Sequence, residues 1–344
     1  MTTTYDQAMP QLLRGGQLDR SSARALMAEL VRGDLGAARV AAVLTALAAR
    51  PVGAEELIGF ASVLRERARR VQVQGDTLDT CGTGGSGLST ANTSTMAAFV
   101  LAAAGVAVTK HGNRKSSGRC GSVDVLEAVG IRVEIGPELA PSLLAAHNLA
   151  FLFAPLYHPA VGMVMPVRRE LGFRTVFNLL GPLANPAGAS HQLLGVSDAD
   201  AAPHMAAALA GLGVLRAMVV RGDDGLDELS LAAPSTIWHV AAGEAVRVER
   251  VEPEALGLSR VAPEALAGGD PSYNAALLQA VLRGQERGAH AEHVALNAGA
   301  GLQLMGRAAT LAEGVAKARA LLHDGAGWRA LEAYRAATLA VEAA

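Results

Sequence analysis

Residues 79–96, DTCGTGGSGLSTANTSTM, constrain the fold more than any other stretch of the sequence. They place Gly82, Gly84, Gly85 and Gly87, together with several hydroxyl residues, between an apolar strand-like segment and an apolar helix-like segment. Glycine permits backbone angles that side chains forbid, and the free amides that open a helix favour anions. The stretch therefore predicts a phosphate-binding loop between a strand and a helix.

Two other interpretations of this loop remain open at this point. A glycine-rich surface turn seldom needs so many glycines and hydroxyls at a strand-to-helix junction. The spacing from Gly82 to Gly87 also satisfies G-x-G-x-x-G, a weak signal for dinucleotide binding on its own. In a dinucleotide-binding fold an acidic residue should end the second strand, whereas Lys110 stands there in this chain. Because an ammonium group suits phosphate oxygens, Lys110 argues against a nicotinamide cofactor.

The apolar pattern of the chain changes character near residue 74. The pattern of the first seventy residues predicts helices, including residues 37–47 and 54–70, and shows no strand-like alternation. Farther on, apolar strands alternate with helical segments, which predicts a largely parallel sheet covered on both faces. The expected strands are residues 77–81, 106–110, 149–154, 192–197 and 217–221.

We therefore expect an α/β protein with two domains. The first is a small all-helical N-terminal domain, residues 1–73, with a contribution from about residues 160–190, a proline-bounded amphipathic segment that we expect to pack back on it. The second is a larger α/β domain, residues 74–344, with a mostly parallel central sheet. Beyond Leu231 the pattern predicts a hairpin and then helices, which we place at about 272–284, 289–305, 311–323 and from 328.

Composition and charge exclude several classes of protein. Aromatic residues make up 3% of the chain and hydrophobic residues 51%, which favours closely packed helices and a parallel sheet over an aromatic-rich β-sandwich. The formal net charge is -2 without a Lys/Arg block, so we expect no nucleic acid partner. The longest apolar run, residues 96–108, is shorter than the ~20 residues of a membrane helix, so we expect no membrane partner. Cys81 and Cys120 are too few for a disulfide framework, which fits a reducing cytoplasm.

Polar residues cluster at three further places. The loop after residues 106–110 carries cationic, amide and hydroxyl side chains suited to phosphate, namely Lys110, His111, Asn113, Arg114, Ser116, Ser117 and Ser122. Arg168 has the planar fork that matches a carboxylate, although an arginine on a helix exterior is an equal alternative. Asp227 and Glu228 supply hard oxygen ligands that suit magnesium joined to substrate phosphates, and Asp223 and Asp224 read as turn residues.

These clusters, in this order, resemble the anthranilate phosphoribosyltransferase family over essentially the whole chain. The matching motifs are GTGGSG (82–87), NTST (92–95), KHGNR (110–114), GSVDVLEAVG (121–130), FLFAPLYHPA (151–160), PVRRELGFRTVFNLLGPLANPA (166–187) and DGLDELSL (224–231). The resemblance implies transfer of a phosphoribosyl group from phosphoribosyl pyrophosphate to anthranilate in tryptophan biosynthesis, and a homodimer formed through the helical domain.

The resemblance also implies which residues bind each ligand. Phosphoribosyl pyrophosphate would bind Gly82, Gly85, Ser86, Thr90, Asn92, Thr93, Ser94, Thr95, Lys110, His111, Gly112, Asn113, Arg114, Lys115, Ser116, Ser117, Gly118 and Ser122. Anthranilate would bind Gly82, Asn113, Arg168, His111, His158, Gly181 and Pro182. Two Mg²⁺ ions are expected, one on Ser94 and Glu228 and one on Asp227 and Glu228.

One residue departs from the family pattern. The glycine loop of the family usually reads GTGGDG, whereas this chain has Ser86 at the acidic position. Three rivals stay open: a pyrimidine nucleoside phosphorylase or a nucleic-acid-binding relative on the same architecture, a nicotinamide-dependent oxidoreductase, and a non-enzymatic binding protein. Arg168, Asn113 and the pair Asp227 and Glu228 argue against the first, and Lys110 argues against the second.

Overall fold

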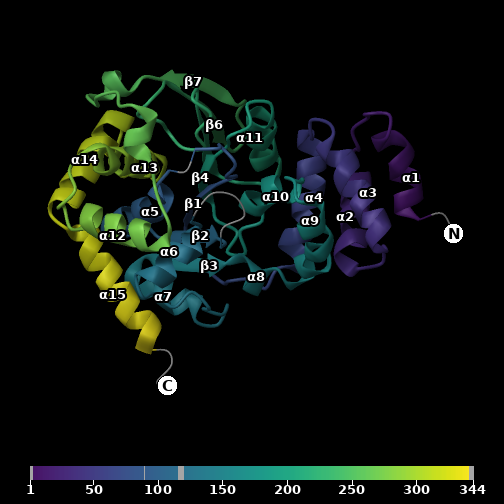
Figure 1. Cartoon of the computed structure of the whole chain (residues 1–344), viewed down its shortest axis with the longest axis horizontal. Helices are drawn as coiled ribbons and strands as arrows, with labels where there is room; N and C mark the ends of the chain where they lie inside the picture. Colours follow the sequence, from purple (N-terminus) through teal and green to yellow (C-terminus); the bar gives the residue numbers. More distant parts are fainter. Residues whose placement is uncertain (1–2, 89, 115–119, 341–344) are drawn as a thin grey trace.

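The computed structural model describes residues 3–88, 90–114 and 120–340. A bundle of helices that carries the N-terminus lies at one end of the molecule, and a sheet surrounded by further helices forms the rest (Figure 1). None of the helices within those ranges is both long enough and apolar enough to span a bilayer.

The bundle is built from the first four helices and from a segment far along the chain. Its helices are α1 (Thr4–Leu12), α2 (Arg20–Arg32), α3 (Ala37–Ala48), α4 (Ala54–Arg67), η1 (Pro159–Met163), α9 (Met165–Leu171) and α10 (Phe177–Leu183). Asp19 caps α2, because its carboxylate accepts a hydrogen bond from the Ser22 amide. Val167, Phe177 and Leu180 share one hydrophobic core with the first four helices. The segment from η1 to α10 thus packs against helices that precede it by about a hundred residues.

Three connections join the bundle to the sheet, and they lie side by side. The chain passes between the two parts after α4, before η1 and after α10. The Arg69 amide donates to the Tyr157 carbonyl at 2.8 Å, and the Val71 amide donates to the Pro186 carbonyl at 3.1 Å. The three crossings are therefore hydrogen-bonded to one another where the bundle meets the sheet.

Seven strands form one sheet in the order β3-β2-β1-β4-β5-β6-β7. The strands are β1 (Leu78–Gly82), β2 (Val108–Gly112), β3 (Leu149–Phe153), β4 (His191–Gly195), β5 (Arg216–Gly222), β6 (Ser235–Ala241) and β7 (Arg247–Val251). The first five are parallel, while β6 and β7 pair antiparallel as the hairpin that the sequence predicts. All five strands expected from the sequence are present, so the α/β class with a mostly parallel sheet is confirmed.

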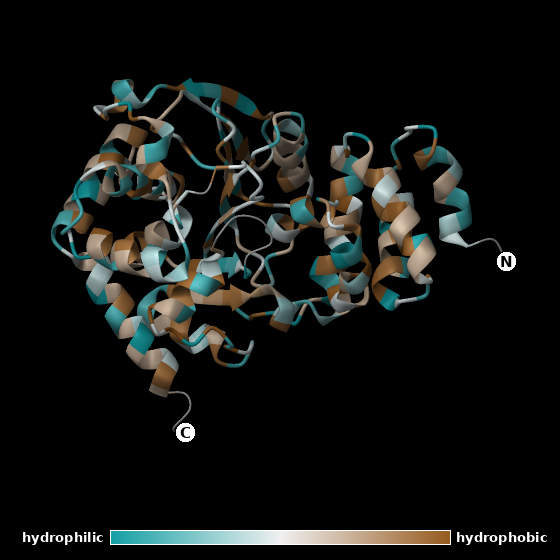
Figure 2. Ribbon diagram, viewed as in Figure 1, coloured by the Kyte–Doolittle hydropathy of each residue, from teal (hydrophilic) through white to brown (hydrophobic). Residues whose placement is uncertain are grey.

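The sheet separates two hydrophobic cores. Along β4 and β5, alternate residues such as Leu193 and Met218 enter one core, and Leu194 and Val219 enter the other. The second core is the one that the bundle shares, together with α11 (Ala201–Gly211). Many helices show both brown and teal residues in Figure 2, as helices that bury one face should.

The remaining helices cover the first core. They are α5 (Thr93–Ala103), α6 (Ser122–Ala128), α7 (Ala140–His147), α8 (Ala154–Tyr157), η2 (Pro253–Leu256), η3 (Pro263–Leu266), α12 (Pro271–Leu282), α13 (Ala289–Leu304), α14 (Leu311–His323) and α15 (Ala326–Ala340). A Cβ added to Gly299 of α13 would meet the backbone of α14, so small residues let these two helices pack closely.

The strand order places a crevice above β1 and β4. Chain order reverses between these two strands, and Gly82 at the end of β1 pairs with Gly195 at the end of β4. In open parallel sheets ligands bind at such a switch point, outside the carboxyl ends of the strands. The glycine-rich stretch begins at that point.

Candidate active site

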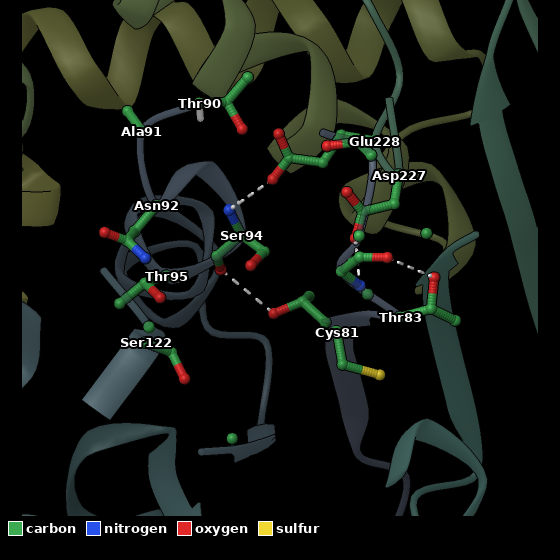
Figure 3. Close-up of a pocket in the computed structure, with 18 of the residues that line it drawn as sticks. Cys81, Thr83, Thr90, Ala91, Asn92, Ser94, Thr95, Ser122, Asp227 and Glu228 are labelled. Atoms are coloured by element: carbon green, nitrogen blue, oxygen red, sulfur yellow. Dashed lines mark hydrogen bonds between the residues drawn. The ribbon is translucent and has the colours of Figure 1, made fainter. Parts of the chain in front are cut away.

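A cavity of about 680 Å³ opens at the carboxyl ends of β1, β2, β4 and β5. That volume lies in the range of small-molecule sites, roughly 300–1,000 Å³. Most of the predicted site residues line it: Gly82, Gly85, Ser86, Thr90, Asn92, Ser94, Thr95, Lys110, His111, Gly112, Asn113, Arg114, Ser122, Asp227 and Glu228. Figure 3 labels ten of the lining residues, with Asp227 and Glu228 across from the start of α5. Thr93, His158, Arg168, Gly181 and Pro182 do not line it, and Lys115, Ser116, Ser117 and Gly118 lie outside the described residues.

The glycine loop, residues 82–88, offers unused backbone donors to the cavity. Gly84, Gly85 and Gly87 adopt φ values of 63°, 82° and 74°, which favour glycine. The Gly84 amide donates to the Asp227 carboxylate at 2.7 Å. In the described part of the chain, the amides of Gly85, Ser86 and Gly87 have no hydrogen-bond acceptor. Consecutive free amides form an anion-binding nest.

The Ser86 side chain forms hydrogen bonds within its own loop. Its hydroxyl donates to the Leu88 carbonyl and accepts from the Leu88 amide, both at 3.2 Å. A hydroxyl carries no charge, so Ser86 adds no negative charge beside Asp227 and Glu228, unlike the aspartate common at this position. The loop is consequently less acidic than the family pattern predicts.

The N-terminus of α5 faces the cavity and is capped by a distant carboxylate. Asn92 precedes the helix but makes no side-chain cap, and the Ser94 amide instead donates to the Glu228 carboxylate at 3.2 Å. The positive end of the helix dipole therefore holds a negative charge already, as expected for an anion site. The Thr93 hydroxyl bonds His293 Nδ1 at 3.1 Å, behind the residues that line the cavity.

Lys110 is buried beneath the loop, 2% exposed, at β2. Its ammonium donates to the Thr80 carbonyl and, at 3.1 Å, to the Ser94 hydroxyl. Burial lowers the pKa of Lys110, and nearby Asp79 opposes that change. Asp79 is fully buried, and burial raises its pKa to about 6. One of its oxygens accepts from the His111 amide at 3.1 Å, so Asp79 also fixes the end of β2.

Asp227 and Glu228 lie in the connection between β5 and β6. Asp223 and Asp224 are in a turn, as expected. Helix α13 fixes the carboxylate segment through the next residue: Asn297 accepts from the Leu229 amide at 3.0 Å and donates to its carbonyl at 3.1 Å. The two peptide groups of Leu229 are thereby held by one side chain.

The carboxylate pair fits a divalent cation. Burial, and then the charge of Asp227, raises the pKa of Glu228 to about 8. Glu228 Oε2 is buried without a hydrogen-bond donor from the described residues. His293 Nε2 is 3.7 Å from it, but burial lowers the pKa of His293 to about 4, so the imidazole is neutral and donates to the Leu229 carbonyl. Two buried carboxylates without a cation are unfavourable, and a bound cation would remove that cost.

A second group of predicted residues lies where α10 covers the sheet. His111 Nδ1 is 3.1 Å from the Gly181 carbonyl, and the rings of His111 and His158 lie 5.1 Å apart. The Nε2 atoms of both histidines are buried, without a hydrogen-bond partner among the described residues. The Pro182 carbonyl accepts from Gln192 at 2.6 Å, which ties α10 to β4.

Arg168 lies on α9 with its charge unpaired by any carboxylate of the described residues. Its guanidinium lies over the Phe177 ring at 5.0 Å and donates to Met165 Sδ at 3.3 Å. Nε is buried and has no acceptor in the part of the chain that the structure describes. The structure thus places Arg168 among apolar neighbours, apart from the lining of the large cavity.

The two neutral histidines predict that the fold is sensitive to acid. Burial lowers the pKa of His111 to about 3 and that of His158 to about 4. The unfolded chain takes up these protons near pH 6.5, so the free energy of unfolding should fall as the pH is lowered from 7 towards 4. Urea unfolding at pH 7.5 and 5 should show a smaller loss in the double variant His111→Gln, His158→Gln than in the parent. The exposed His323→Gln should keep the parent's loss, and equal losses in all three proteins would contradict the assignment.

Sequence reasoning missed several residues that shape the site. Gly195 matters because a Cβ there would overlap the Asp227 backbone carbonyl. His293 and Asn297 are polar residues one helical turn apart in the mostly apolar middle of α13, a signal that could have identified them as buried polar residues. Arg174 lines the cavity from the segment before α10 and carries no comparable signal in the sequence.

Comparisons with known proteins agree with this geometry. Residues 7–68 match the family described as "Glycosyl transferase family, helical bundle domain", and residues 74–328 match "Glycosyl transferase family, a/b domain". The anthranilate phosphoribosyltransferase of Chloroflexus aggregans is 47% identical over 95% of each chain.

Two solved structures share the whole fold. That of anthranilate phosphoribosyltransferase from Thermus thermophilus is 44% identical with a TM-score of 0.90, covering 96% of this chain and 99% of its own. The enzyme from Saccharomyces cerevisiae, solved in complex with phosphoribosyl pyrophosphate and Mg, is 28% identical with a TM-score of 0.88 and 98% coverage of both chains. The chain therefore belongs to the anthranilate phosphoribosyltransferase family.

Proposed function

We propose that this protein transfers the phosphoribosyl group of phosphoribosyl pyrophosphate to the amine of anthranilate, giving N-(5-phosphoribosyl)anthranilate and pyrophosphate in tryptophan biosynthesis. The observation that carries the proposal is the cavity at the switch point, which is lined both by Asp227 and Glu228 and by the glycine loop, whose amides at residues 85–87 have no acceptor among the described residues. Amides attract a diphosphate, and the carboxylates attract the cation that accompanies it.

The reaction separates charge, and the cavity is suited to that separation. The anomeric C–O bond breaks with its electron pair going to the diphosphate, while the amine nitrogen bonds to the same carbon and then loses a proton. Positive charge develops on the ribose ring as negative charge develops on the diphosphate. Donors fixed in place before the reaction, such as the loop amides and Lys110, stabilise the developing anion without reorganising.

Two Mg²⁺ ions are part of the proposal. Ser94 and Glu228 would hold one ion, and Asp227 and Glu228 the other, with substrate phosphates and water completing each shell. The unpartnered Glu228 Oε2 supports this assignment. Within the described ranges no three His, Cys, Asp or Glu side chains gather as a metal-binding group, which suits ions shared with a phosphate ligand. The bound metal would supply charge neutralisation of the departing diphosphate.

The acceptor site is proposed beside the ribose end of the cavity. Arg168 would bind the anthranilate carboxylate, and Asn113 and Gly82 would contact the ring and amine from the cavity side. His111, His158, Gly181 and Pro182 would shape an apolar channel, and the neutral state of both imidazoles supports this role. The 5-phosphate would meet residues 114–118 and Ser122.

We also propose a domain division, an oligomeric state and a location for this protein. We keep the division into a helical domain, residues 1–73 with about 160–190, and an α/β domain, residues 74–344, because one core joins both helical segments. A homodimer through the helical domain follows from the family resemblance. A cytoplasmic location is consistent with Cys81 and Cys120, which are free thiols.

One assay tests the proposed function. Protein, Mg²⁺, phosphoribosyl pyrophosphate and anthranilate are mixed, and loss of anthranilate fluorescence is followed. Turnover that needs all three additions is expected. Phosphorolysis of thymidine or reduction of NAD, without loss of anthranilate, would replace the proposal with one of the rival functions.

Replacement of Arg168 tests the acceptor site. We expect Arg168→Ala to raise the KM for anthranilate at least tenfold more than the KM for phosphoribosyl pyrophosphate, because a charge-assisted pair with the carboxylate is lost, worth about 1.5–3 kcal/mol. Initial rates with each substrate varied in turn give both constants. Arg169→Ala, one residue along the same helix, is the matched control and should change neither constant. A larger effect on phosphoribosyl pyrophosphate would remove Arg168 from the acceptor site.

Ser86→Asp restores the family's usual residue. A carboxylate in the glycine loop adds negative charge beside Asp227 and Glu228, so we expect the Mg²⁺ concentration for half-maximal rate to change more than the KM for anthranilate. Magnesium titrations of parent and variant measure the first, and anthranilate titrations at saturating Mg²⁺ measure the second. Superimposable magnesium titrations would refute this expectation.

A further inference from the structure

The guanidinium of Arg174 lies beside the glycine loop. Arg174 comes from the connection between α9 and α10, and one of its terminal nitrogens donates to the Thr83 carbonyl at 2.9 Å. A Cβ added to Gly85 would overlap the guanidinium, so the group sits directly against the Gly85 backbone. Arg174 is exposed, and it lines the large cavity with Asp227 and Glu228. A cation from the bundle segment therefore reaches the predicted diphosphate site.

The other cations that line the cavity are already occupied. Lys110 is 2% exposed and donates to Thr80 and Ser94. Arg114 bonds the Glu127 carboxylate and lies 4.9 Å over the Phe153 ring. Arg174 makes no ion pair with a carboxylate within residues 3–88, 90–114 and 120–340. Among these three, Arg174 is the cation whose charge is free to bind a ligand.

The donors around Arg174 are arranged for phosphate oxygens. The amides of Gly85, Ser86 and Gly87 have no acceptor in the described chain, and the guanidinium borders the same loop. Among the described residues, one nitrogen of the guanidinium has an acceptor, the Thr83 carbonyl. The planar fork of arginine binds two phosphate oxygens at once, which a lysine cannot do.

We propose that Arg174 binds the diphosphate of phosphoribosyl pyrophosphate together with the amides of the glycine loop, and stabilises the charge that the diphosphate gains as it leaves. The inference rests on the proposed function and adds a binding residue to it. When the anomeric C–O bond breaks, its electron pair stays on the diphosphate, and Arg174 pairs with that charge without taking or giving a proton. The released product, pyrophosphate, should bind the same donors.

Pyrophosphate binding tests the proposal without turnover. Calorimetry in Mg²⁺ measures the Kd of inorganic pyrophosphate for the parent and for Arg174→Gln. We expect the variant's Kd to rise about ten- to a hundredfold, as for loss of a charge-assisted hydrogen bond. The KM for phosphoribosyl pyrophosphate should rise with it, while the KM for anthranilate stays within about twofold and the melting temperature is unchanged. Arg174→Lys, which keeps the charge without the fork, should lie between the two proteins.

Arg221→Gln is the matched control. Arg221 also donates to a backbone carbonyl, that of Ser197 at 3.0 Å, but does not line the cavity, so its loss should leave the Kd of pyrophosphate unchanged. A Kd for Arg174→Gln within twofold of the parent would overturn the proposal. So would parallel losses of affinity for pyrophosphate and anthranilate with a lower melting temperature, which would make Arg174 a support of the loop at Thr83. If the parent binds pyrophosphate but does not consume anthranilate, the proposed function fails and the comparison of variants still decides the role of Arg174.

Discussion

Replacing Glu228 by Gln is expected to lower kcat roughly a hundred- to a thousandfold, while the fold is kept or stabilised. Glu228 is the carboxylate shared by both proposed metal ions, so an amide there weakens both. Its Oε2 is buried without a hydrogen-bond donor in the described ranges, and its carboxylate lies near that of Asp227. Removing a buried charge that lacks a partner relieves a cost, so the melting temperature of the metal-free variant should not fall below that of the parent.

The measurements are kcat across a magnesium titration and the melting temperature with and without Mg²⁺ and pyrophosphate. The parent should be stabilised by the two ligands together, and Glu228→Gln should lose most of that shift. Glu332→Gln, on the exposed side of α15, is the matched control and should behave as the parent. A Glu228→Gln protein with a lowered kcat but a full ligand-induced shift would show that Glu228 does not hold the metal.

Gly195→Ala is expected to reduce activity on the order of a hundredfold although residue 195 is not charged and donates nothing to substrate. The Cβ would overlap the Asp227 backbone carbonyl, so the segment carrying Asp227 and Glu228 has to move away from β4. Crowding of this kind costs about 1–3 kcal/mol of stability. The displacement also changes the distance between the carboxylates and the glycine loop.

The displacement of the carboxylates can be measured separately from the loss of stability. The magnesium concentration for half-maximal rate should rise in Gly195→Ala, and the KM for anthranilate should change little. Gly36→Ala, where an added Cβ meets nothing within 4 Å, is the matched glycine control. Normal magnesium dependence in Gly195→Ala would mean that the segment adapts to the methyl group without moving its carboxylates.

The fold was predictable where it depends on local patterns. Short apolar strands between helical segments were sufficient to place all five parallel strands, and the glycine-rich stretch was sufficient to locate the end of β1. The order of the strands was not predictable in that way, because it depends on which helices cross which face. The pairing of Gly82 with Gly195, which creates the crevice, joins residues more than a hundred positions apart.

The site was predictable where a residue's chemistry alone reveals it. Lys110, Asp227 and Glu228 line one cavity, as their charges and neighbours suggest. Gly195 acts through shape, so nothing in its own neighbourhood of sequence indicates its role. Asn297 is recognisable as a polar residue among apolar ones, but the sequence does not show that it bonds the backbone of the carboxylate segment. Thr93 lies next to cavity residues in the sequence, but its hydroxyl bonds His293, a contact between residues two hundred positions apart that the sequence does not indicate.

The three hydrogen-bonded crossings between bundle and sheet also determine how the two parts can move. A single connection would leave the bundle free to rotate in any direction, whereas three hydrogen-bonded connections restrict it. A displacement of the bundle relative to the sheet, and so of Arg168 on α9 relative to the ends of the strands, has to be absorbed at all three crossings together. Arg174 adds a further link between the two parts, because it comes from the connection between α9 and α10 and already bonds the Thr83 carbonyl beside the glycine loop. A rotation of the bundle against the sheet therefore has to carry the glycine loop with it or break that bond.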